Sequence, residues 1–149
     1  MSLWGEDGEL QHRRYAVRTL EKATREVEQQ VKDFAEWNGT KKDPMPAESV
    51  RLALEWYDSF QEALLSLRDF PSRRPLIPEQ KLFAQDVHQL IFRRSASAPA
   101  WRMLFVIEEE SEDGPLVQVI HVRHGSRRPI TRKEAREIPL RDEGSNLRD

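Results

Sequence analysis

Residues 117–129 read VQVIHVRHGSRRP, an apolar run that carries two histidines and an arginine toward its end. Gly125 breaks the run, and Arg127 and Arg128 follow almost directly. An apolar run bounded by a glycine favours a strand. A strand is a rigid platform, and cations clustered at its rim can hold phosphate. The stretch therefore predicts the final strand of a sheet with a basic site at its end.

Two further strands are expected just upstream. Residues 87–92 (VHQLIF) and 101–107 (WRMLFVI) read as strands, separated by a Ser/Ala/Pro-rich loop. An acidic turn at residues 108–115 then leads into the final strand at 116–124. Three successive strands with short connections predict an antiparallel meander.

Two amphipathic helices are expected before the strands. Apolar residues recur at three- and four-residue spacing, first at Ala23, Val27, Val31, Phe34 and Ala35. The second stripe, which begins after Pro46, comprises Val50, Ala53, Leu54, Tyr57, Phe60, Leu64 and Leu67. This periodicity is typical of helices with one buried face, and Thr19 is a suitable N-cap for the first. The short break at residues 38–44 predicts that the two helices form an antiparallel hairpin.

The predicted fold class is α+β. Residues 14–18 can form a strand before the first helix, which completes the order β-α-α-β-β-β, with an antiparallel sheet packed against an α-helical hairpin. At 149 residues, one domain is expected. We expect a flexible extension at residues 1–13, the domain at 14–130, and a charged tail at 131–149 in which 131–137 can form a short helix.

Charge is unevenly distributed along the chain. The net charge is −2, which gives no overall attraction to nucleic acid or membrane. Residues 121–136, however, hold six Lys or Arg against the single acid Glu134, whereas residues 108–113 hold five acids. The C-terminal half is therefore expected to be dipolar.

Several function classes are disfavoured by composition. The chain has no cysteine, which excludes disulfides and cysteine-ligated zinc. We find neither metal-ligand spacing nor a glycine-rich phosphate loop, so no metal and no cofactor is expected. No apolar run reaches the roughly 18–20 residues of a membrane span, and the N-terminus lacks the pattern of a signal peptide. A cytoplasmic protein is expected.

The order and spacing of these elements resemble the RelE/ParE superfamily, the toxins of bacterial type II toxin–antitoxin systems, also described as plasmid-stabilisation proteins. The resemblance covers residues 14–129. Its markers are EWYD at 55–58, LLSL at 64–67, FP at 70–71, WRMLFVI at 101–107 and VRHGSRRP at 122–129.

The resemblance implies a toxin that inhibits translation by ribosome-dependent mRNA cleavage, with a cognate antitoxin and the ribosome with its mRNA as partners. Histidine suits proton transfer near neutral pH, and arginine binds phosphate as a bidentate fork. The candidate catalytic residues are Arg102, Arg123, His124 and Arg127. The candidate RNA-binding residues are Lys81, Arg73, Arg74 and Arg128.

Strand alternation places these candidates on particular faces of the sheet. It puts His121 and Arg123 on one face, and His124 on the other with Ile120 and Val122. On the preceding strand Arg102 points to the same side as apolar residues, so it needs a partner or a route to the rim.

Other interpretations stay open. Arg102 and Arg123 can instead be sheet-surface residues that pair with the acidic turn. A ParE-like DNA gyrase inhibitor that acts by protein binding is an alternative, favoured because no tyrosine follows Gly125. A catalytically inactive binding protein of the same fold is a third possibility.

Overall fold

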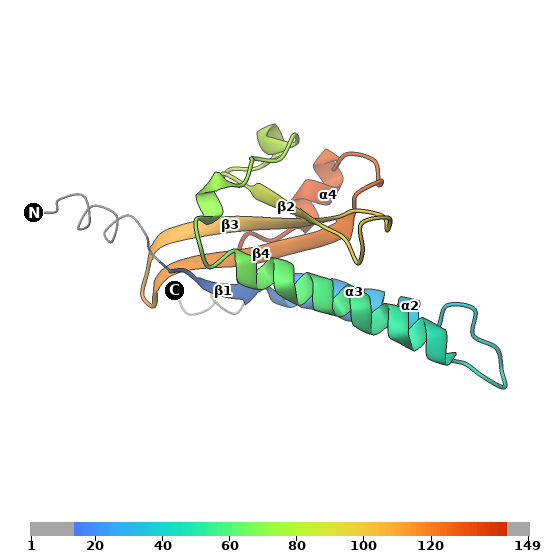
Figure 1. The fold of residues 1–149 in the computed structure, drawn as a ribbon. Coiled ribbons are helices and arrows are strands. Elements are labelled where there is room, and N and C mark those ends of the chain that lie inside the picture. Colours follow the sequence, from blue (N-terminus) through green and yellow to red (C-terminus); the bar gives the residue numbers. More distant parts are fainter. Residues whose placement is uncertain (1–13, 143–149) are drawn as a thin grey trace, which may run out of the picture.

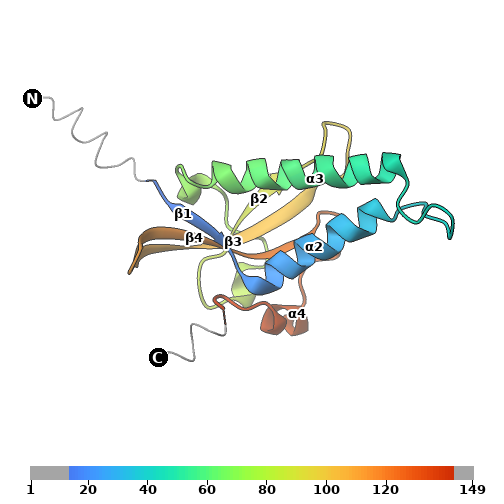
Figure 2. The ribbon, with the colours of Figure 1, turned by 90° about the horizontal axis from the view of Figure 1, so that it is seen from below.

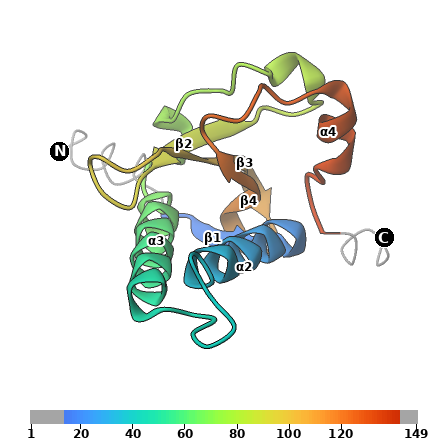
Figure 3. The ribbon, with the colours of Figure 1, turned by 90° about the vertical axis from the view of Figure 1, so that its right-hand side faces the viewer.

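A four-stranded sheet lies at the centre of the molecule, with a helical hairpin on one face and a short C-terminal helix on the other (Figures 1 and 3). The computed structural model describes residues 14–142, so the extension expected at residues 1–13 lies outside the described residues. The elements are β1 (Ala16–Thr19), α2 (Glu21–Ala35), α3 (Ala47–Ser66), β2 (His88–Phe92), β3 (Trp101–Ser111), β4 (Gly114–His124) and α4 (Arg132–Glu137). Two short 3₁₀ turns, η1 (Pro71–Arg73) and η2 (Gln80–Leu82), lie between α3 and β2. The predicted α+β class is confirmed.

The sheet is mixed, which corrects the expectation of a wholly antiparallel sheet. The strand order is β1-β4-β3-β2, and β2, β3 and β4 form the predicted antiparallel meander. β1, however, pairs with β4 in parallel. The reason is the helical hairpin, which returns the chain to the start of β1, where the Tyr15 N–H donates to the Arg68 carbonyl at 2.9 Å. β2 therefore runs in the same direction as β1, and so does β4 two strands later.

The two long helices lie side by side against the sheet (Figure 2). Ala23 and Val27 of α2 are buried as predicted. Thr19 is not the cap, because α2 has Leu20 at its N-cap without a side-chain bond, and the Glu21 N–H instead donates to the Asp142 carboxylate at 2.9 Å. A residue from the far end of the chain thus satisfies the start of the helix.

The buried face of α3 is rotated from the predicted stripe. Leu54 and Tyr57, which were expected in the core, are 58% and 38% exposed, whereas Trp56 is 1% exposed. Trp56 packs against Phe92 and Trp101 at ring-centroid distances of 5.7 and 5.1 Å. Burying the largest aromatic ring against the sheet outweighs burying a leucine, because the area removed from water is greater.

Core residues lie on both faces of the sheet. On the helical face, Trp56 and Phe60 pack with Met103 and Phe105 of β3. The members of the opposite cluster include Leu104, Val106, Ile120, Ile130, Ala135 and Ile138. The segment expected to be a charged tail therefore contributes to the core through α4, whose start is stabilised by a capping box between Thr131 and Glu134.

A β-bulge in β4 changes the face of the sheet to which its side chains point. The register shifts between Leu104 and Phe105, so that His121 pairs with Leu104 while Val119 pairs with Phe105. Ile120 consequently packs in the cluster opposite to that of Val122, which corrects the simple alternation expected from sequence. An extra residue in one strand of a pair has this effect on alternation.

Candidate functional site

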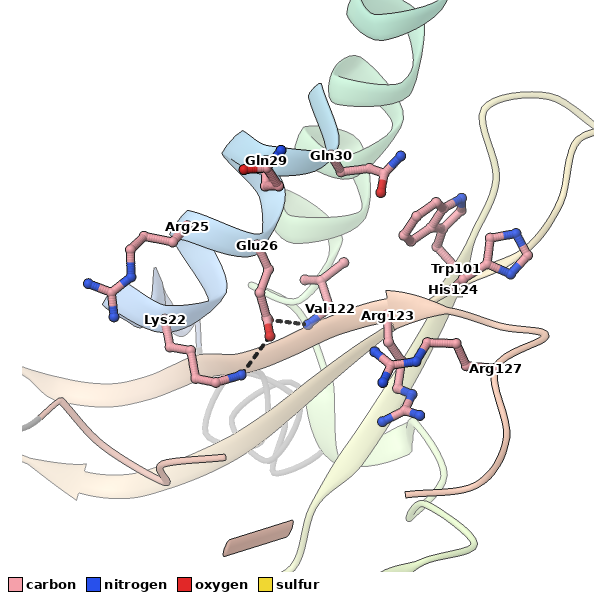
Figure 4. A pocket seen from close by; sticks show the side chains of 10 residues that line it. All are labelled: Lys22, Arg25, Glu26, Gln29, Gln30, Trp101, Val122, Arg123, His124 and Arg127. Carbon is pink, nitrogen blue, oxygen red and sulfur yellow. Dashed lines mark hydrogen bonds and ion pairs between the residues drawn. The ribbon is translucent and has the colours of Figure 1, made fainter. Parts of the chain in front are cut away.

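A cavity of about 440 Å³ opens between α2 and the rim of the sheet where β3 begins and β4 ends (Figure 4). We name it the basic cavity. Its lining residues are Lys22, Arg25, Glu26, Gln29, Gln30, Trp101, Val122, Arg123, His124 and Arg127. One lysine, three arginines and one carboxylate are therefore among the described residues around the opening, which suits an anionic ligand.

The position of α2 follows from the shortness of β1. β1 ends at Thr19, opposite Val119 of β4, so no strand of the described part of the chain borders the edge of β4 beyond that point. The chain turns there into α2, and Glu26 accepts the Val122 N–H at 3.1 Å. A helix side chain thus satisfies a backbone group that a longer β1 would have paired.

Glu26 is the anionic centre of this region. Its other carboxylate oxygen accepts bonds from Lys22 Nζ at 2.7 Å and His121 Nδ1 at 2.8 Å. Burial raises the pKa of Glu26, but the hydrogen bond and charge of His121, with the bonds from Lys22 and Val122, lower it below the ordinary value. Glu26 is therefore ionised at neutral pH, and it orients groups rather than standing free to accept a proton.

Arg123 is buried at the base of the cavity and is incompletely paired. One terminal nitrogen, Nη2, donates to the Arg128 carbonyl at 2.8 Å. The other, Nη1, lies 3.4 Å from His121 Nε2 and 3.6 Å from a Glu134 oxygen. Nε has no hydrogen-bond partner within residues 14–142. Burial, followed by the charge of Arg127, lowers the pKa of Arg123. Glu134 compensates this buried cation only at the longer ion-pair distance, so an anion beside Arg123 would stabilise it further.

His124 and Arg127 stand at the mouth of the same cavity. Arg127 is half exposed and donates to Glu134 at 2.7 Å, and its guanidinium lies close to that of Arg123 (Figure 4). The His124 ring packs edge-to-face on Trp101 with centroids 5.0 Å apart. His124 Nδ1 accepts the Ser126 N–H at 3.1 Å, so we infer that neutral His124 carries its proton on Nε2.

Arg102 lies outside the basic cavity. It donates to both carboxylate oxygens of Glu79, at 3.0 and 2.8 Å, and its Nε donates to Gln89 at 2.8 Å. Neither Arg102 nor Arg123 has its partner in the acidic turn at 108–113, which corrects that expectation, because the chain brings Glu79 and Glu134 closer. Burial raises the pKa of Glu79, but the bonds from Arg102 and from the Ile130 N–H lower it to about 2.

The candidate RNA-binding residues are dispersed. Lys81 is exposed on η2, and Arg73 lies over the Phe70 ring at 4.0 Å. The carbonyl oxygens of Arg74 and Arg128 accept bonds from His88 and Arg123, respectively. None of these four cations lines the basic cavity.

Sequence reasoning therefore brought together Arg123, His124 and Arg127 but missed the contribution of α2. Lys22, Arg25 and Glu26 read as an ordinary solvated helix face, and the i,i+4 pairings of Lys22 with Glu26 and of Arg25 with Glu21 were local signals. Trp101 was noted only as a marker of the resemblance.

Comparison with models of known protein families, with curated proteins and with solved structures gave no match. Within residues 14–142, no group of three His, Asp or Glu side chains is placed to hold a metal ion. Over the same residues, the helices are too short or too polar to cross a membrane.

We expect Glu26→Gln to lower the free energy of unfolding by about 2 kcal/mol, because bonds to a charged acceptor are lost from a partly buried site. Urea unfolding at neutral pH measures this. Glu28→Gln is the matched control, since Glu28 is exposed on the same helix, and its effect should stay within about 0.5 kcal/mol. Equal effects of the two substitutions would contradict the assigned role of Glu26.

Proposed function

We propose that this chain is the toxin of a type II toxin–antitoxin system with a RelE/ParE-like fold, and that it inhibits translation by ribosome-dependent cleavage of mRNA at the basic cavity. The observation that carries the proposal is the convergence of Arg123, His124 and Arg127 from the end of β4 with Lys22 and Arg25 from α2 around one opening. The β-α-α-β-β-β order, in which the hairpin returns the chain to β1, supports the resemblance noted in the sequence.

The groups around the cavity suit phosphodiester chemistry. In the proposed reaction the 2′-oxygen of a ribose attacks the phosphorus and the bond to the 5′-oxygen breaks, while negative charge builds on the phosphate oxygens. Arg123 and Arg127 stabilise that charge, and His124 donates a hydrogen bond from Nε2. Positioned cations and donors account for much of the rate in such reactions.

Dependence on the ribosome is consistent with the proton balance of this site. The 2′-hydroxyl must lose a proton and the 5′-oxygen must gain one. Glu26 is the one carboxylate among the described residues that line the cavity, and three donors already hold it. The group that accepts the proton of the 2′-hydroxyl and the group that protonates the 5′-oxygen are therefore both expected from the ribosome-bound RNA or from water.

A second candidate function is a ParE-like inhibitor of DNA gyrase that acts by protein binding. The observation that favours it is the pairing of the half-exposed Arg127 with Glu134. Cations held in this way suit a charged interface as well as they suit a nuclease site. Under either candidate the partners include an antitoxin, for which an acidic segment would fit the surface of residues 121–136.

Induced expression in a bacterial host, with translation and DNA supercoiling followed in parallel, tests the proposal. We expect translation to fall first, with mRNA cut inside codons. An early loss of supercoiling with intact mRNA would instead identify a gyrase poison. Normal growth and intact mRNA would contradict both candidates.

In the same assay, Arg127→Ala should relieve growth arrest without unfolding the protein, because the Arg127 side chain is 53% exposed. Lys133→Ala, an exposed position on α4, is the control and should stay as toxic as the unmodified chain. Thermal unfolding of both variants checks that they remain folded. If Arg127→Ala stays fully toxic, Arg127 is not part of the proposed site.

A further inference from the structure

A second cavity, of about 340 Å³, adjoins the basic cavity and differs from it in chemistry. We name it the aromatic cavity. Its lining residues are Gln30, Phe34, Leu52, Trp56, Arg94, Ala98, Pro99, Trp101 and His124. Gln30, Trp101 and His124 line both cavities, and Figure 4 shows them at the end of the basic cavity away from Lys22. The two cavities therefore adjoin at these three residues, and we refer to them together as the hollow, with a cationic part and an aromatic part.

One residue that lines each cavity carries a buried donor atom that lacks a hydrogen bond within residues 14–142. Among the described residues, the buried side-chain nitrogen or oxygen atoms that lack a hydrogen bond are Trp56 Nε1 and Arg123 Nε. Trp56 lines the aromatic cavity and Arg123 lines the basic one. Nearly all buried polar groups in folded proteins are satisfied, so each exception calls for an explanation. A ligand with acceptors at both ends of the hollow supplies one.

We propose that the hollow binds one nucleotide unit, with the base in the aromatic cavity and its phosphate in the basic cavity. This rests on the proposed function and goes beyond it, because it assigns the base to a site between α2, α3 and the loop before β3. Both volumes fall in the range of small-ligand sites, about 300–1,000 Å³.

The chemistry of a nucleobase matches the aromatic cavity. Trp101 and Phe34 offer ring surfaces for a flat base, and the stacking of a base on an aromatic side chain is sequence-tolerant. The base edge carries carbonyl and ring-nitrogen acceptors for Trp56 Nε1, and Gln30 offers both a donor and an acceptor at the junction. An acidic peptide also offers carbonyl acceptors, but its aliphatic side chains have no flat face to stack on Trp101 and Phe34, so we favour the nucleotide.

The test is a titration of the full-length chain by calorimetry with the four nucleoside 3′-monophosphates, with ribose 5-phosphate and with inorganic phosphate. Stacking of about 1–3 kcal/mol corresponds to a gain of about 5- to 150-fold in affinity over ribose 5-phosphate. Equal affinities for the nucleotides and ribose 5-phosphate would overturn the base site and leave the phosphate site intact. Tighter binding of an acidic, leucine-containing peptide would overturn it as well.

Trp56→Phe removes the unpartnered N–H. The smaller ring leaves space in the core, so the thermal stability should fall. At a temperature where the variant is folded, we expect affinity for the nucleotides to fall about 3- to 10-fold, with affinity for inorganic phosphate unchanged. Trp37→Phe, at a position 63% exposed, is the matched control and should bind as the unmodified chain does. Unchanged nucleotide affinity in Trp56→Phe would contradict the proposal.

Failure of the nucleotide site and failure of the proposed function give different results. If nucleotides bind as expected while expression leaves mRNA intact, the mRNA-cleavage function fails and the nucleotide site stands. If mRNA is cut but free nucleotides bind no better than ribose 5-phosphate, the function stands and the base site fails.

Discussion

Glu79→Gln is expected to lower the free energy of unfolding by about 3 to 5 kcal/mol at neutral pH, a large part of the stability of a domain of this size. Glu79 is 9% exposed, and it holds both terminal nitrogens of the buried Arg102 and the Ile130 N–H. Removing its charge leaves a guanidinium buried without a counter-ion, whose desolvation is no longer offset. The same bond to Ile130 fixes the chain just before α4, so the variant should also loosen the C-terminal helix.

The pH dependence of this stabilisation has a definite sign. Folding lowers the pKa of Glu79 from 4.5 to about 2, so the folded state favours the ionised carboxylate. The contribution, on the order of 3 kcal/mol, is fully present above pH 4.5 and is lost as the pH falls toward 2. The stability difference between the unmodified chain and Glu79→Gln should therefore narrow over that interval.

Urea unfolding at pH 7 and at steps down to pH 2 measures both effects. Glu48→Gln is the matched control, because Glu48 pairs with Arg51 on the exposed face of α3. Exposed pairs contribute about 0–1 kcal/mol. A Glu79→Gln effect as small as that of the control, or one that widens in acid, would contradict the assigned pairing.

His124→Ala is expected to slow the proposed mRNA cleavage by about 10²- to 10³-fold, the usual cost of removing one donor that faces developing charge. The ring is positioned by its contact with Trp101 and by the bond from the Ser126 N–H, which directs the protonated Nε2 away from the backbone. His124→Gln keeps a side-chain N–H and should retain more activity than His124→Ala.

Cleavage of a defined mRNA on purified ribosomes, read by primer extension at matched protein concentration, measures this effect. Lys81→Ala is the control, because Lys81 lies on η2 and does not line either cavity. Its rate should stay within about twofold of the unmodified chain, since ΔΔG values for exposed positions are small. A His124→Ala rate equal to that of Lys81→Ala would remove His124 from the mechanism.

Features with a local or periodic origin could be predicted from the sequence. The two helices, the three-stranded meander and the cationic end of β4 follow from apolar spacing and from turn residues that act over a few positions. The short helix at 131–137 belongs to the same class, because Thr131 and Glu134 satisfy its first turn between themselves.

Features that depend on distant parts of the chain could not be predicted. Apolar spacing does not show that Trp56 is buried and Leu54 exposed, because burial depends on which side chain packs against Phe92 and Trp101 in the folded state. The register shift at Leu104 and Phe105, which separates Ile120 from Val122, arises between two strands and has no signature in either alone.

The same distinction between local and distant origin applies to the residues of the candidate site. The residue types and spacing at 121–128 were sufficient to place Arg123, His124 and Arg127 at one rim, because they are neighbours on one strand end. Tertiary packing determines the ion-pair and hydrogen-bond partners of these residues. Glu26 contacts Val122 and His121, about a hundred residues away in the chain. Glu79 pairs with Arg102. Which cation a carboxylate pairs with depends on their distance and on their burial in the folded state. Both are set only when the helices pack on the sheet.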